Sequence, residues 1–129
     1  MTTKNLNNFQ LNLSSFVGTE QYFFNPLFKN LYYTEGVKYF LDNAGQGANW
    51  FLTLVATEIK PILKPDFYFI ELKVEKDETA KIICQRDKGE PILYKLELDY
   101  TDCPYSEEPY KFCFDVNEEQ QILCLLSEY

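Results

Sequence analysis

The residues of this chain that could act together in chemistry lie in two short polar segments. One segment follows Gly18 and the other, which joins a phenol, a hydroxyl and a carboxylate, precedes Pro104. The candidate pocket residues are Thr19, Glu20, Tyr22, Tyr100, Thr101 and Asp102. Brought together, they would suit a small-ligand site or an enzyme. Residues of these types also satisfy backbone groups in turns and helix caps, so both interpretations stay open.

The chain contains no histidine, and this narrows its chemistry. Histidine is the commonest general base near neutral pH and the commonest metal ligand in proteins. Cys103 has no imidazole to activate it, and the neighbouring Glu107 and Glu108 would raise the pKa of its thiol. One alternative is oxygen-only binding of Ca²⁺ or Mg²⁺ around Asp99 and Asp102, although no EF-hand spacing is present. We predict a non-enzymatic protein with no catalytic residue, no cofactor and no metal.

Length and composition predict one compact domain over residues 1–129. A chain of 129 residues with 46% hydrophobic and 25% charged residues can bury one core. No segment is apolar for long enough to span a membrane, and no signal peptide is apparent. The four cysteines match neither a CxxC pair nor a zinc motif, which favours reduced thiols and a cytoplasmic location; two disulfides in an exported protein are the alternative.

Hydrophobic periodicity places helices before strands. Thr34 is a suitable N-cap for a short amphipathic helix that ends near Gly45, and a more apolar helix is expected from Ala48 to Ile59. Apolar and polar residues then alternate in five expected strands: 67–75, 80–86, 92–100, 112–116 and 121–126. The pattern predicts an α+β fold in which a sheet of about five antiparallel strands has the N-terminal helices packed on one face.

Negative charge is concentrated in the second half of the chain. Residues 1–65 carry five lysines and four acids, whereas residues 66–129 carry seven basic and sixteen acidic residues, and the whole chain has a net charge of −8. This balance disfavours direct nucleic-acid binding and permits a basic protein partner. Strand alternation predicts that several acids share the solvent face of the sheet. The predicted partner-binding residues are Glu71, Glu75, Glu97, Asp99, Asp102, Glu107, Glu108 and Asp115. The alternative is that the acids only keep the protein soluble.

Several motifs resemble a bacterial family of small proteins known only as a domain of unknown function. They are FVGTEQY from Phe16, YTEGVKYFLDNAG from Tyr33, the tryptophan of NWFL, YTDCP from Tyr100 and the terminal LSEY. The resemblance spans nearly the whole chain and implies no activity. It points to shared positions that include Thr34, Glu35 and Gly36, and Asn25 stands where many members have histidine.

Two classes of function follow. The preferred one is a non-enzymatic acidic protein that binds a basic protein surface, such as a groove meant for nucleic acid, without membrane contact. In size and charge it resembles phage and mobile-element inhibitors of the anti-CRISPR and anti-restriction type. The alternative is a ligand-binding protein or enzyme that uses the two polar segments. A homodimer is a further expectation, because ten aromatic residues lie between Phe9 and Phe40, with an irregular segment of short extended pieces from Gln21 to Tyr33.

Overall fold

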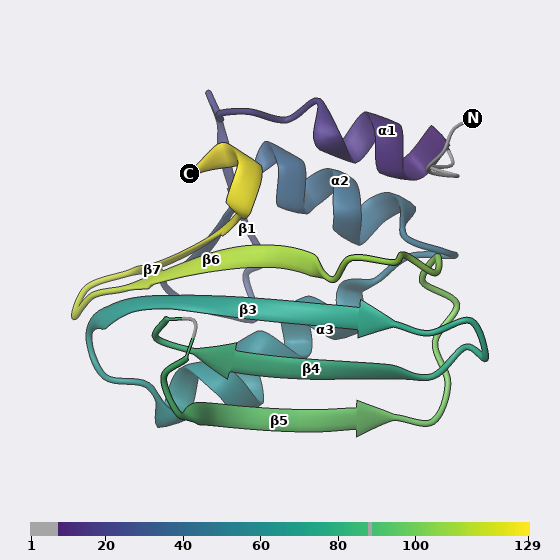
Figure 1. The fold of residues 1–129 in the computed structure, drawn as a ribbon. Helices are drawn as coiled ribbons and strands as arrows, with labels where there is room; N and C mark the ends of the chain where they lie inside the picture. The colour runs from purple at the N-terminus through teal and green to yellow at the C-terminus, as the bar shows by residue number, and fades with distance from the viewer. Residues whose placement is uncertain (1–7, 88) are drawn as a thin grey trace.

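The computed structural model describes residues 8–87 and 89–129, and its main element is a seven-stranded sheet (Figure 1). The strands are β1 (Tyr22–Phe24), β2 (Leu31–Thr34), β3 (Asp66–Val74), β4 (Ala80–Gln85), β5 (Ile92–Leu98), β6 (Tyr110–Val116) and β7 (Gln121–Leu125). Their order across the sheet is β1-β2-β7-β6-β3-β4-β5. Strand β2 pairs with β7 in parallel, and the other five neighbouring pairs are antiparallel.

The five long strands expected from the sequence are confirmed, and their alternation separates a buried face from an open one. In β3, the side chains of Tyr68, Ile70, Leu72 and Val74 are buried, while the residues between them are partly exposed. Register places Phe112 of β6 beside Ile70, so neighbouring strands bury the same face. Period-two spacing of apolar residues is therefore sufficient to define which side of the sheet faces the core.

Short helices cover the buried face. They are α1 (Asn8–Ser14), α2 (Glu35–Asn43), α3 (Asn49–Leu54), the π-helical turn η1 (Val55–Ile59) and the 3₁₀ turns η2 (Lys60–Ile62) and η3 (Leu126–Glu128). Phe40 of α2 and Phe51 of α3 pack on Phe112, with ring centroids 5.1 and 4.7 Å away. Helix α1 packs outside α2, where Phe9 stacks on Tyr39 at 5.9 Å. The opposite face of β3, β4 and β5 carries no helix (Figure 1).

The prediction of a sheet of about five antiparallel strands was wrong in two respects: the sheet has seven strands, and one pair of strands is parallel. The two additional strands, β1 and β2, come from the aromatic segment expected to contain short extended pieces, and β2 is added in parallel beside β7. The backbone N–H of Gln121 donates to Asn30 O at 2.8 Å, just before β2. Strands of three and four residues show too few alternations to reveal a period, and a parallel partner about ninety residues away leaves no local turn signal.

The helix predictions need smaller corrections. Thr34 caps α2 as expected, and its Oγ1 accepts a hydrogen bond from Val37 N at 3.4 Å. The helix expected over 48–59 is α-helical only to Leu54 and continues as η1 and η2 toward Pro65. Helix α1 was not predicted, because seven residues are too few to show a helical period in the sequence.

Candidate functional site

The two polar segments proposed as one pocket lie at opposite ends of helix α2. At its beginning, Thr19 Oγ1 accepts a hydrogen bond from Glu35 N at 3.1 Å, and a Glu35 carboxylate oxygen accepts one from Glu20 N at 3.1 Å. Helix α2 has nine residues, which corresponds to a length of about 13 Å. Tyr22, on the strand that follows Glu20, exposes 55% of its surface. This first segment therefore holds the beginning of α2 in place.

The second segment binds backbone groups beyond the end of α2. Asp102 Oδ2 accepts a hydrogen bond from Gln46 N at 2.8 Å, and Thr101 Oγ1 accepts one from Cys103 N at 3.2 Å. Gly45 has a φ of +60°, and a Cβ at this position would lie 2.5 Å from Asp102. Tyr100 is 65% exposed. The structure thus does not bring the two segments into one pocket, and their hydroxyl and carboxylate groups mainly serve neighbouring backbone.

Glu128 is a structural residue that the sequence reasoning did not single out. Its Oε1 accepts hydrogen bonds from Thr34 Oγ1 at 2.5 Å and Leu125 N at 3.0 Å, and its Oε2 accepts one from Gly36 N at 3.0 Å. A Cβ at Gly36 would meet Glu128 and Leu125 within 2.7 Å. A carboxylate at the N-terminus of α2 also interacts favourably with the helix dipole. Glu128 belongs to the LSEY motif, but the groups that it binds, in Thr34 and Gly36, lie more than ninety residues away in the sequence.

Two of the four thiols, those of Cys84 and Cys103, are poorly suited to nucleophilic chemistry. All four cysteines are free, and burial raises the pKa of both Cys84 and Cys103 to about 12, so these two are protonated at neutral pH. Cys113 and Cys124 face each other across β6 and β7; a hydrogen bond from Cys124 lowers the pKa of Cys113 and raises that of Cys124. Among residues 8–87 and 89–129, no three histidine, cysteine or carboxylate side chains are grouped as a metal site.

The open face of the sheet carries mixed charge. Three of the predicted partner-binding acids, Glu71, Glu97 and Asp115, lie on this face. Glu71 is in register with Lys111, and Glu97 is in register with Lys81 and lies 3.8 Å from Lys95. Asp115 lies between Phe67 and Ile122. Lysines in neighbouring positions therefore offset most of the negative charge that strand alternation places here.

The other five predicted acids gather at one end of the sheet, which we call the acidic end. This end is formed by the turn between β3 and β4 and the connection between β5 and β6, on the right in Figure 1. Its carboxylates are Glu75, Asp77, Glu78, Asp99, Asp102, Glu107 and Glu108. All except the partly exposed Asp102 are exposed. Asp77 and Glu78, in the turn between β3 and β4, were not among the predicted residues.

Contacts between the two loops fix the shape of the acidic end. Thr101 N donates to Glu78 O at 2.8 Å, and Lys73 Nζ donates to Ser106 O at 3.0 Å. Asp77 accepts hydrogen bonds from Thr79 N and Thr79 Oγ1 at 3.1 and 2.6 Å, and these bonds lower the pKa of its carboxyl. Lys73 and Lys76 lie over the Tyr105 ring, and Lys73 also pairs with Glu75 at 3.4 Å. The acidic end thus holds seven carboxylates and the ammonium groups of Lys73 and Lys76, and Lys81 stands in register with Lys73 at its border.

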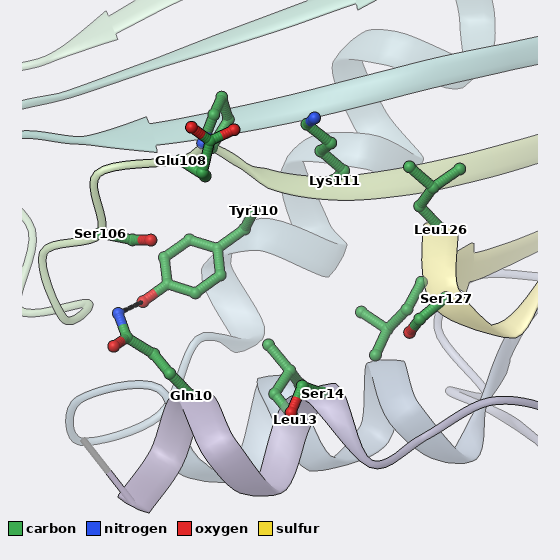
Figure 2. A pocket seen from close by; sticks show the side chains of 11 residues that line it. Gln10, Leu13, Ser14, Ser106, Glu108, Tyr110, Lys111, Leu126 and Ser127 are labelled. Atoms are coloured by element: carbon green, nitrogen blue, oxygen red, sulfur yellow. Dashed lines mark hydrogen bonds between the residues drawn. The ribbon is translucent and has the colours of Figure 1, made fainter. Parts of the chain in front are cut away.

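An apolar groove lies between α1 and the beginning of β6 (Figure 2). It has a volume of about 440 Å³, and its walls include Leu13, Pro109, Leu125 and Leu126. Polar groups in its inner wall are bonded within the protein: Gln10 Nε2 donates to Tyr105 O at 2.8 Å and to Tyr110 Oη at 3.2 Å, as the dashed line in Figure 2 shows for Tyr110. None of the candidate pocket residues predicted from the sequence lines this groove.

The chain belongs to a family of unknown function, DUF6876, whose model matches residues 7–129. The resemblance seen in the sequence motifs is therefore confirmed. A search of curated proteins and a search of solved structures each found no match. In the part of the chain that the structure describes, no helix has the length and apolar character needed to cross a membrane.

Proposed function

We propose that this protein is a non-enzymatic binding module whose acidic end meets a basic surface on a partner protein. The observation that carries the proposal is the gathering of seven carboxylates on two loops with two nearby ammonium groups. Exposed charges of one sign steer encounter with an oppositely charged surface and fix its orientation. The two loops that carry the carboxylates connect paired strands, and a backbone hydrogen bond from Thr101 to Glu78 joins them, which keeps the spacing of the carboxylates defined.

A binding role agrees with the chemistry of the remaining side chains. The sequence has no imidazole, the buried thiols of Cys84 and Cys103 are protonated, and the two polar segments are engaged at separate ends of α2. There, the carboxylates of Glu35 and Asp102 accept hydrogen bonds from backbone N–H groups. The cytoplasm, where thiols stay reduced, is the compartment that suits four unpaired cysteines.

The preferred partner is a basic surface that otherwise binds nucleic acid. A net charge of −8 opposes direct contact with phosphates, but it allows the protein to compete with them for lysine and arginine side chains. In this form of the proposal, the protein inhibits a nucleic-acid-handling complex, in the manner of anti-defence or anti-CRISPR proteins. The comparison with such inhibitors rests on size and charge.

Comparative capture from cells of the native host tests the proposal. The baits are the wild type, an acidic-end variant (Asp99→Asn, Glu107→Gln, Glu108→Gln) and a control variant (Glu71→Gln, Asp115→Asn, Glu119→Gln). Both variants lose one Asp and two Glu, so their net charges are equal. We expect a basic protein to be captured by the wild type and the control and lost with the acidic-end variant. Equal capture by all three baits, or capture unchanged in high salt, would contradict the proposal.

The apolar groove supports a second candidate function, the binding of a small and mainly apolar molecule. Its volume of about 440 Å³ lies within the range of about 300–1,000 Å³ that is usual for ligand pockets. Leu126 at its wall remains 41% exposed. An apolar ligand would gain free energy by covering this surface.

Binding of the fluorescent probe 1-anilinonaphthalene-8-sulfonate tests the groove. We expect the probe to bind the folded protein at one site, and Leu13→Trp to prevent binding by filling the groove. Leu27→Trp is the control, because Leu27 is 82% exposed and does not line the groove. Probe binding that is equal in both variants would eliminate the groove as a ligand site.

A further inference from the structure

We infer that strand β5 is a self-complementary edge through which two copies of this chain associate, in antiparallel pairing centred on Leu96. The two seven-stranded sheets would then join across β5 of one copy and β5 of the other. This inference does not depend on the proposed function, because the pairing uses Tyr94 to Leu98, whereas the carboxylates of the acidic end lie on the β3–β4 turn and on the connection that begins at Asp99.

Among the residues that the structure describes, strand β5 has a neighbouring strand on one side only. It is last in the strand order and pairs with β4, and Figure 1 shows no element along its outer side. Tyr94, Leu96 and Leu98 point to the helix-covered face but are only partly buried, whereas Ile82 and Cys84 on β4 are fully buried. An uncovered edge offers backbone donors and acceptors and apolar side chains to another strand.

The residue order along β5 suits pairing with itself. When two copies pair antiparallel about Leu96, Lys95 of each copy stands opposite Glu97 of the other. On the opposite side of the strand, Tyr94 meets Leu98 and Leu96 meets its own copy. Each side of the joined sheet thus matches: the open face gains two pairs of opposite charge, and the helix-covered face gains a continuous apolar row.

Neighbouring registers are less favourable. Pairing centred on Lys95 puts two ammonium groups opposite each other, and pairing centred on Glu97 does the same with two carboxylates. Like charges placed directly opposite destabilise a strand pair. A parallel pair in register would align every lysine and every glutamate with its own copy. Among the antiparallel registers centred on Lys95, Leu96 and Glu97, the one centred on Leu96 therefore pairs unlike charges and the other two pair like charges.

The geometry also limits the pairing to a short segment and keeps the negative regions apart. A shift in register between Cys84 and Gln85 disturbs the ladder before Tyr94, so the regular part of β5 runs from Tyr94 to Leu98. Bulges of this kind restrict how far an edge can extend its pairing. In an antiparallel pair, the C-terminal ends of the two β5 strands point away from each other, so the two acidic ends lie at opposite ends of the dimer.

Sedimentation or light scattering over a range of protein concentrations tests the inference at physiological salt. We expect the wild type to shift from monomer to dimer with increasing concentration, and Lys95→Glu to weaken dimerisation by at least about tenfold, because two carboxylates then face each other. Lys29→Glu is the matched control, since it makes the same change in net charge on an exposed loop near the opposite edge of the sheet. Circular dichroism verifies that both variants fold.

A mixing experiment gives the decisive result. Lys95→Glu carries two acids at the paired positions, and Glu97→Lys carries two lysines, so each variant alone should be monomeric. Mixed in equal amounts, they should form a heterodimer in which every opposite pair has opposite charge. A wild type that stays monomeric, a dimer equally sensitive to Lys29→Glu, or two variants that do not associate when mixed would overturn the inference. Dimerisation through another surface, such as exposed Phe24 and Leu27, would leave Lys95→Glu as dimeric as the wild type.

Discussion

The open face of the sheet and the acidic end contain the same kinds of charged residue but arrange them differently. On the open face, strand register sets Glu71 beside Lys111 and Glu97 beside Lys81. At the acidic end, two loops bring seven carboxylates together, and the ammonium groups of Lys73 and Lys76 are held there over the Tyr105 ring. Alternation along a strand thus determines which face a side chain occupies, whereas register and turns determine which charges become neighbours.

The largest expected change in stability comes from a substitution on the buried side of β6, a strand that adjoins both the open face and the acidic end. Phe112 is fully buried and packs on Phe40 and Phe51. We expect Phe112→Ala to lower the free energy of unfolding by about 3–5 kcal/mol, because it leaves a cavity under the sheet. Lys111→Ala, one residue earlier and on the open face, should change it by no more than about 0.5 kcal/mol. Chemical denaturation measures both, and similar losses would contradict the assigned faces.

A smaller loss is expected when a carboxylate that holds backbone is removed. Glu128→Gln should destabilise the protein by about 1–3 kcal/mol, because its charged oxygens accept three hydrogen bonds at the beginning of α2. Glu107→Gln at the acidic end serves as the control and should be nearly neutral. Thermal and chemical unfolding of the two variants distinguishes a carboxylate that stabilises the fold from one that is free to contact a partner. A neutral Glu128→Gln would show that the α2 contacts add little.

The smallest effect should differ in sign between the two regions. Glu71→Gln with Glu97→Gln removes partners of cross-strand lysines, so we expect stability to fall by about 0.5–1 kcal/mol. Glu107→Gln with Glu108→Gln removes carboxylates that repel their neighbours, so stability should stay the same or rise by a few tenths, about 0.3 kcal/mol. Both double variants lose two negative charges. Denaturation at low salt measures the difference, and equal losses would mean that the open face and the acidic end are electrostatically alike.

Much of the fold could be predicted because it is encoded in local periodicity. The alternation from Tyr68 to Val74 and the Thr34 cap each act within a few residues, and both are confirmed. The parallel addition of β2 to β7 and the binding of Glu128 at α2 depend on contacts across ninety residues or more. Such pairings leave no pattern in a single sequence.

The sequence indicated which acidic residues could form a binding surface, but it did not indicate which of them lie beside lysines and which lie beside other acids. The sequence offered the acids of the second half as candidates, yet it could not indicate that Lys81 and Lys111 stand beside Glu97 and Glu71. Asp77 and Glu78, which lie in a turn, were not among the predicted acids. Turn residues carry no face preference, although the β3–β4 hairpin places both next to the β5–β6 connection.

The most direct test of the acidic end is the dissociation constant of the captured partner for the wild type, the acidic-end variant and the control variant, measured at about 50 and about 300 mM salt. We expect the acidic-end variant to bind the partner at least about tenfold more weakly than the wild type at low salt. The affinity of the control variant should change by less than about twofold, and high salt should remove most of the difference between the variants. Equal weakening in both variants, or a difference that persists at high salt, would contradict the proposed role of the acidic end.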